Sequence, residues 1–158
     1  MMDIKLVKKL REETGAGMLD CKKALEQAKD SYEDAVKILL EQSTKIEGNT
    51  RVASKGLCSV VINQNEAILF EVNAETDFVS KNDLFKTLVH DLGTHLIHTH
   101  VTNQKDALKV EIDGMTVEKK IEITSSLIKE NAQLRRFYRV IKNEGQTFGS
   151  YVHLGGKI

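Results

Sequence analysis

The chain has 158 residues, of which 41% are hydrophobic and 29% charged, a balance typical of a globular protein and not of a disordered or fibrous one. Lys and Arg number 23, and Asp and Glu also number 23, so no net charge attracts the chain to nucleic acid or to an acidic membrane. No apolar run approaches the roughly 20 residues of a transmembrane helix, and the N-terminus lacks a signal-peptide pattern. Cys21 and Cys58 form no CxxC pair, which favours a cytoplasmic protein with reduced thiols.

The first 43 residues predict three short helices. Apolar residues recur at the spacing of one helix face in DIKLVKKLREET (3–14), MLDCKKALEQA (18–28) and YEDAVKILLEQ (32–42). In the second segment this spacing predicts an inward face of Met18, Cys21, Ala24 and Leu25. Ser31 supplies an N-cap oxygen for the third helix. We therefore expect a three-helix bundle over residues 1–43, with a thin core for a unit standing alone.

A polar segment over residues 44–55 predicts a linker, because a Gly-Asn pair interrupts any regular pattern there. The chain then becomes β-prone. GLCSVVI (56–62) and AILFEV (67–72) flank the turn-forming sequence NQNE, which predicts an antiparallel hairpin. Near the end, LRRFYRVI (134–141) and TFGSYVHL (147–154) flank a glycine-containing turn and predict a second hairpin.

Two helices are predicted between these hairpins. Ser80 offers an N-cap with Asp83 three residues later, and apolar spacing continues to about His98. After a short β-prone segment and an Asp-Gly turn, Thr116 caps a helix whose apolar residues continue to Ile128. Strands and helices in blocks of two favour an α+β core subdomain over residues 56–158, with a mainly antiparallel sheet and helices packed on one face.

The chain ends within HLGGKI, beside what would be an open sheet edge. Sheet edges are normally paired, covered or blunted. We therefore expect either that the sequence is a fragment of a longer protein or that a second copy covers this edge in a homodimer.

No motif of covalent catalysis stands out. The GAG at residues 15–17 lacks the GxxxxGK[ST] pattern of a phosphate-binding loop and suits a turn between helices, where glycine adopts a positive φ. The sequence GxSxG is absent, and Cys21 falls on an inward helix face, where an inert buried thiol is the ordinary case. We therefore expect no enzyme activity and no cofactor.

Four of the five histidines lie close together, at positions 90, 95, 98 and 100. The spacing is not HExxH, and Asp91 is the one carboxylate nearby, so a solvated helix end is favoured over a metal site. The fifth, His153, stands beside Tyr151 in a predicted strand, as a surface residue or a polar contact to a partner.

The segment NAETDFVSKNDLF (73–85) lies where the first hairpin gives way to a helix. Here Thr76, Asp77, Phe78 and Val79 place a carboxylate beside a phenyl ring. In one interpretation Phe78 is buried and Asp77 caps the next helix, since aromatic side chains are usually buried. In the other, Phe78 protrudes as an anchor for a partner's pocket, and the neighbouring carboxylate competes for donors or disturbs a cation there. The pattern alone does not choose between them.

Several long segments resemble the bacterial elongation factor Ts family: LVKKLREETGAGMLDCKKAL, FEVNAETDFVSKNDLF, IKENAQLRRF and GSYVH. They follow the family's order and are spread over nearly the whole chain. Family members are guanine-nucleotide exchange factors for elongation factor Tu, the GTPase that delivers aminoacyl-tRNA to the ribosome. The resemblance implies the same role in translation elongation, with GDP-bound elongation factor Tu as partner and no membrane or direct nucleic-acid contact.

The resemblance also implies which residues act. The bundle would be a ubiquitin-associated-like (UBA-like) domain that docks on the partner's GTPase domain, and the TDFV element would enter near the partner's Mg²⁺ and dislocate it. The implied contacts are Met18, Leu19 and Lys22 in the bundle, Thr76, Asp77, Phe78 and Val79 in TDFV, and Ile128, Lys129 and His153 further on.

Two features depart from the family pattern. The family commonly has IGEN where this chain has IKEN, so Lys129 replaces a glycine and would hinder a close backbone approach. Most members also continue into a second core subdomain and a coiled coil, and this chain ends before both. The alternative function is therefore a binding module, a UBA-like bundle with an α+β scaffold, that binds a helical partner without exchanging its nucleotide. A hydrolase or metal-dependent enzyme is a distant third.

Overall fold

The computed structural model describes residues 4–14, 16–43 and 52–158. The chain divides into two compact units, one within residues 1–49 and the other within residues 50–158. Most of the predicted linker, residues 44–55, lies outside the described residues. Within the described ranges, no helix is long and apolar enough to cross a membrane.

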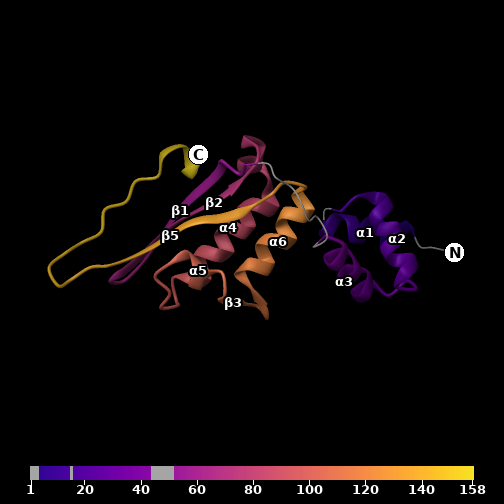
Figure 1. The fold of residues 1–158 in the computed structure, drawn as a ribbon, viewed down its shortest axis with the longest axis horizontal. Coiled ribbons are helices and arrows are strands. Elements are labelled where there is room, and N and C mark those ends of the chain that lie inside the picture. The colour runs from indigo at the N-terminus through magenta and orange to yellow at the C-terminus, as the bar shows by residue number, and fades with distance from the viewer. Residues whose placement is uncertain (1–3, 15, 44–51) are drawn as a thin grey trace. The chain divides into compact units, whose positions relative to one another are not determined.

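The first unit contains the three predicted helices, α1 (Ile4–Thr14), α2 (Met18–Gln27) and α3 (Tyr32–Ser43), drawn at the indigo end of Figure 1. One stripe from each helix forms its core: Val7, Leu10, Cys21, Ala24, Leu25, Ala35 and Leu39. Ser31 Oγ accepts a hydrogen bond from the Asp34 N–H at 3.4 Å, as the predicted cap requires. Met18 does not join the inward face that its spacing predicted. It is 42% exposed because it is the first residue of α2, at the edge of the buried stripe.

The second unit is built on a three-stranded antiparallel sheet in the order β1-β2-β5. Strands β1 (Lys55–Asn63) and β2 (Glu66–Ala74) form the predicted hairpin, paired without interruption from Lys55 with Ala74 to Asn63 with Glu66. Strand β5 (Gln133–Ile141) pairs antiparallel with the other edge of β2. The predicted α+β class with an antiparallel sheet is confirmed.

The remaining elements connect β2 to β5. In chain order they are the 3₁₀ helix η1 (Asp77–Lys81), α4 (Asp83–Leu96), α5 (Gln104–Ala107), β3 (Glu111–Ile112), β4 (Met115–Thr116) and α6 (Val117–Ile128). Strands β3 and β4 form a separate two-stranded sheet. Helices α4 and α6 lie on the same side of the main sheet, as Figure 1 shows, and cover one of its two faces.

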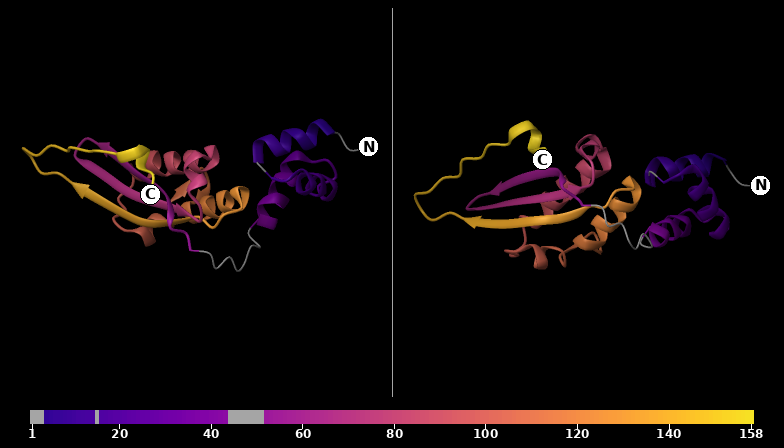
Figure 2. Two further views of the ribbon diagram at one scale, coloured as in Figure 1. Left: turned by 90° about the horizontal axis from the view of Figure 1, so that it is seen from above. Right: turned by 45° about the horizontal axis from the view of Figure 1, so that its top comes forward.

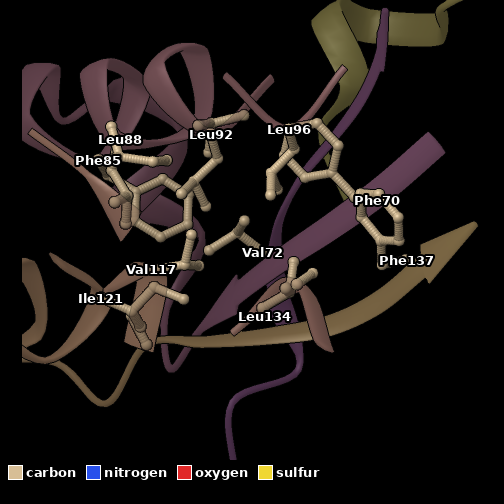
Figure 3. Packing of buried hydrophobic residues seen from close by; sticks show 14 of the residues in the cluster. Phe70, Val72, Phe85, Leu88, Leu92, Leu96, Val117, Ile121, Leu134 and Phe137 are labelled. Atoms are coloured by element: carbon tan, nitrogen blue, oxygen red, sulfur yellow. The ribbon is translucent and has the colours of Figure 1, made fainter. Parts of the chain in front are cut away.

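The core lies between the sheet and these helices. Alternate residues of β2, Ile68, Phe70 and Val72, point toward α4 and α6 and are at most 1% exposed. Figure 3 shows Phe70 and Val72 with Phe85, Leu88, Leu92 and Leu96 of α4 and with Val117 and Ile121 of α6, and Ile68 belongs to the same cluster. Helix α4 lies close to the sheet at Gly93. A Cβ added there would lie 2.9 Å from Val61 Cγ2, so glycine permits this approach.

The C-terminal end of α4 is also fixed to the sheet. The Arg139 side chain of β5 is 3% exposed and pairs with Glu66. It donates to the Leu96 carbonyl at 2.7 Å and to the Val101 carbonyl at 2.8 Å. Since the last carbonyls of a helix lack partners within it, this arginine satisfies one of them and ties α4 to β5. The C-terminal end of α4 is therefore anchored to the sheet.

Besides the position of Met18, three predicted features of the second unit differ in the structure. Residues 147–154 do not form the second arm of a hairpin with β5, because Tyr151, Val152 and Leu154 are exposed and bury nothing against the sheet. Asn82, not Ser80, caps α4: its Oδ1 accepts from the Phe85 N–H at 3.2 Å, whereas Ser80 lies inside η1.

The third difference concerns the edge of the sheet. The segment after β5 loops away and returns to β1, as the yellow trace in Figure 2 shows. Lys157 forms an antiparallel bridge with Leu57, and Ile158 exchanges hydrogen bonds of 3.0 and 3.3 Å with Gly56. The segment beside which the sequence predicted an open sheet edge thus pairs with the first residues of β1.

Candidate functional site

The turn between β2 and α4 places two neighbouring side chains on opposite sides. Phe78 is 72% exposed, although it is a large aromatic residue, whereas Val79 is 2% exposed and packs in the core. The compact 3₁₀ geometry of η1 produces this reversal between adjacent residues. Of the two interpretations of the TDFV segment, the buried phenyl ring is therefore wrong, and the protruding one agrees with the structure.

Asp77 does not cap α4, since Asn82 has that role. Its side chain is 56% exposed, and its Oδ2 lies 3.4 Å from Lys157 Nζ. A carboxylate on the surface beside an exposed phenyl ring is the arrangement that the second interpretation requires. Lys157 belongs to the segment that pairs with β1, so the returning chain end reaches the turn.

The turn between α6 and β5 is hydrogen-bonded to the TDFV segment. The Glu130 carboxylate accepts from the Thr76 N–H at 2.9 Å and from the Thr76 hydroxyl at 2.6 Å. In the opposite direction, the Glu75 carboxylate accepts from the Asn131 N–H at 2.8 Å. The structure thus brings Thr76 close to the segment that contains Ile128 and Lys129.

Ile128 and Lys129 lie in different environments. Ile128 is half-buried against the core, and Lys129 is exposed at the end of α6. Lys129 has φ 59° and ψ 31°, the left-handed conformation in which a helix commonly ends with glycine. The glycine expected from the family resemblance is therefore explained by backbone geometry within this chain, without a close approach to a partner.

His153 lies on the returning C-terminal segment, in the 3₁₀ helix η2 (His153–Gly156), and is exposed. Its Nδ1 is 3.1 Å from the Tyr151 hydroxyl, and Tyr151 is 83% exposed. The pair forms a polar and aromatic surface, and neither residue lies in the strand that the sequence predicted.

In the first unit, Met18, Leu19 and Lys22 lie on α2. Leu19 is 69% exposed, and Met18 lines a shallow depression with side chains of α1. Lys22 is exposed, with its Nζ 4.0 Å from a Glu26 oxygen. These three side chains form an accessible apolar and basic surface on this unit.

Other chemistry is sparse. Burial raises the pKa of the Cys21 thiol, and burial together with Glu71 raises the pKa of the Cys58 thiol, so both stay protonated and poorly nucleophilic at neutral pH. Among the described residues, no three His, Cys, Asp or Glu side chains are arranged to hold a metal. His95 Nδ1 instead lies 2.8 Å from the Asp91 carbonyl.

Sequence reasoning missed four residues of this region: Glu75, Glu130, Asn131 and Lys157. Their contacts join segments 54 or more positions apart, so no local spacing indicates them. The available signal was weak: IKEN places a glutamate and an asparagine directly after a predicted helix end.

Comparison with known proteins identifies the family of the chain. The family model described as "Elongation factor TS" matches residues 75–158. Elongation factor Ts of Acholeplasma laidlawii (strain PG-8A) is 46% identical over 156 residues, which are 97% of this chain and 53% of that protein. The chain thus spans about half the length of the curated relative. The matched region contains the TDFV turn, both helices that cover the sheet, and the returning C-terminal segment, and on this evidence the chain belongs to the elongation factor Ts family.

Proposed function

We propose that the chain binds GDP-bound elongation factor Tu and promotes release of GDP by inserting Asp77 and Phe78 near the partner's Mg²⁺. The observation that carries this proposal is the 72% exposure of Phe78 on a turn whose next residue, Val79, is 2% exposed. A protruding aromatic side chain that fills a pocket is a typical interface hot spot. A turn held by β2 and α4 presents it at fixed geometry.

The physical mechanism requires no covalent chemistry from this chain. In P-loop GTPases, Mg²⁺ neutralises phosphate oxygens and ties the nucleotide to the protein. An intruding side chain that shifts the elements around this ion weakens GDP binding. By thermodynamic linkage, GDP weakens binding of the exchange factor by the same factor. The driving free energy is the difference between the contacts made with the two nucleotide states.

The four residues of TDFV have different roles in this proposal. Asp77 and Phe78 contact the partner, Val79 anchors the turn in the core, and Thr76 connects it to the α6–β5 turn. A role for Val79 as a direct contact, which the resemblance implied, is not part of the proposal because its side chain is inaccessible.

Further contacts with the same partner are proposed for the exposed side chains that the resemblance implied. In the bundle, proposed to be UBA-like, these are Met18, Leu19 and Lys22, whose surface on α2 is accessible. In the second unit they are Lys129 and His153, with Ile128 contributing its exposed part. We place this activity in the cytoplasm.

The second candidate is a binding module without exchange activity, in which the exposed side chains of α2 and of the TDFV turn bind elongation factor Tu and leave the rate of GDP release unchanged. The two are separated by adding the chain, in amounts far below stoichiometric, to elongation factor Tu loaded with fluorescent GDP and an excess of unlabelled GDP. The proposed function predicts accelerated release with turnover. Binding to elongation factor Tu by light scattering, with an unchanged release rate, would establish the second candidate instead.

A further inference from the structure

Three hydrogen bonds join the TDFV segment to the α6–β5 turn. Both oxygens of Glu130 are used, one by the Thr76 N–H (2.9 Å) and one by the Thr76 hydroxyl (2.6 Å). Glu75 accepts from the Asn131 N–H (2.8 Å) in return. Each segment thus supplies one carboxylate and donates hydrogen bonds to the carboxylate of the other. We call this set the carboxylate clamp: Glu75 and Thr76 on one side, Glu130 and Asn131 on the other.

The clamp lies at the start of the exposed turn, directly before η1. Thr76 is the residue that precedes η1, and its side chain makes no capping bond to η1. Its hydroxyl is donated to Glu130 instead. Hydrogen bonds to ionised carboxylates are stronger than neutral ones. Two from one residue to one carboxylate restrict both the position of the Thr76 backbone and its rotation.

The other anchor of the turn lies on its far side. Val79 packs in the core, three residues after Thr76, and α4 begins at Asp83 with its own cap. Asp77 and Phe78 are therefore the two residues between the clamp and the core anchor. A short segment held at both ends retains little freedom, so its exposed side chains keep a fixed direction.

We propose that Glu130, with Glu75, is a positioning residue that holds Asp77 and Phe78 in the arrangement that binds the partner, an inference that rests on the proposed function. The clamp lowers the entropy that the turn loses on binding, which is the general benefit of preorganisation. It contributes through the turn and makes no contact with the nucleotide or its ion.

The first experiment needs no partner. Amide hydrogen exchange, measured by NMR on the full chain, compares the wild type with Glu130→Ala and with the control Glu122→Ala, an exposed glutamate of helix α6 that pairs with Lys119. The clamp predicts that the Thr76 amide exchanges about 10-fold faster or more in Glu130→Ala, as expected for a lost bond to a carboxylate, and unchanged in the control. Unchanged Thr76 exchange in Glu130→Ala would overturn the proposal.

A matched pair at Thr76 tests the hydroxyl. Thr76→Ser keeps both hydrogen bonds to Glu130, whereas Thr76→Val keeps the shape and loses the hydroxyl. We expect the amide at position 76 to exchange at the wild-type rate in Thr76→Ser. In Thr76→Val its exchange rate should rise toward that of Glu130→Ala. Equal behaviour of the two variants would contradict a role for the hydroxyl bond.

The second experiment measures GDP release from elongation factor Tu over a range of chain concentrations. If the loosened turn occupies the binding arrangement about one tenth of the time, the concentration for half-maximal rate rises about 10-fold while the maximal rate is retained. In a Phe78→Ala background the same substitution should add little, because Glu130 acts through the turn. Fully additive effects would assign Glu130 a direct contact and overturn the positioning role.

The two experiments separate the two proposals. A wild-type chain that does not accelerate GDP release would refute the proposed function, while amide exchange at Thr76 still decides whether the clamp holds the turn. If the wild-type chain accelerates GDP release but the Thr76 amide of Glu130→Ala exchanges its hydrogen at the wild-type rate, the clamp alone would be refuted.

Discussion

Two adjacent residues, Phe78 and Val79, carry opposite roles because of backbone geometry. The sequence placed a phenyl ring and a carboxylate at a junction of strand and helix, but hydrophobicity alone would bury the ring. What decides the outcome is the five-residue 3₁₀ helix, in which Val79 reaches the core and Phe78 does not. Such a short element has no periodic signature, so the exposure of Phe78 could not be predicted from pattern.

Lys129 offers a test of backbone strain at a single residue. Its left-handed conformation costs a residue with a Cβ about 1–2 kcal/mol of stability. Glycine avoids this cost, but its greater conformational freedom in the unfolded state offsets part of the gain. We expect Lys129→Gly to raise the free energy of unfolding by about 1 kcal/mol. Urea denaturation followed by circular dichroism provides the measurement.

The control for this substitution is Lys129→Ala, which removes the charge and the long side chain but keeps the Cβ. It should leave stability near that of the wild type. Equal stabilisation by alanine and glycine would show that the lysine side chain, and not the backbone conformation, is the source of the effect.

At the scale of elements, the patterns with strong local signals were predicted correctly. The hairpin of β1 and β2 and the helix capped by Thr116 appear as expected, with the Thr116 hydroxyl accepting from the Lys119 N–H at 3.2 Å. The prediction that residues 147–154 form a strand paired with β5 was wrong, because β-propensity does not specify a partner. The clamp was missed for a different reason: it joins segments 54 and 56 positions apart, which no local pattern indicates.

The returning C-terminal segment makes a testable contact with β1. Gly156 has φ 83°, and a Cβ there would lie 2.2 Å from the Cys58 carbonyl oxygen. Gly155 also has a positive φ, of 65°, but a Cβ there would meet nothing within 4 Å. Gly156→Ala should therefore detach the segment from β1, whereas Gly155→Ala should cause only backbone strain.

Amide exchange at Ile158, whose N–H donates to the Gly56 carbonyl at 3.0 Å, reports this contact. We expect loss of protection in Gly156→Ala and retention in Gly155→Ala. Both variants place an alanine at a positive φ, but only the Cβ at position 156 would collide with the Cys58 carbonyl. Equal loss of protection in both would therefore contradict the packing argument.

At the scale of the whole molecule, one face of the sheet is covered by helices and the other carries partly exposed apolar side chains: Ile62, Leu69, Tyr138 and Val140. In their midst Glu71 is 3% exposed and pairs with Arg136 at 2.6 Å. Burying such a face would stabilise the unit. The sequence predicted a homodimer in which a second copy covers a sheet edge. A dimer that buries this open face instead is a further prediction.

Light scattering of the purified chain tests this directly. A dimer predicts twice the chain mass of 17.7 kDa, and Leu69→Glu, which places a charge on the open face, should return the mass to that of one chain. A single-chain mass for the wild type would contradict the homodimer and leave the proposed exchange function unaffected.

The central claim is that Phe78 acts outside its own molecule. Release of fluorescent GDP from elongation factor Tu should be compared for the wild type, Phe78→Ala and the control Met115→Ala, another exposed apolar residue, 37% accessible, on β4. Loss of a hot-spot side chain worth about 2 kcal/mol predicts roughly 30-fold slower release for Phe78→Ala, with a thermal unfolding curve like that of the wild type and a normal rate for the control. A folded Phe78→Ala chain that releases GDP at the wild-type rate would contradict the account.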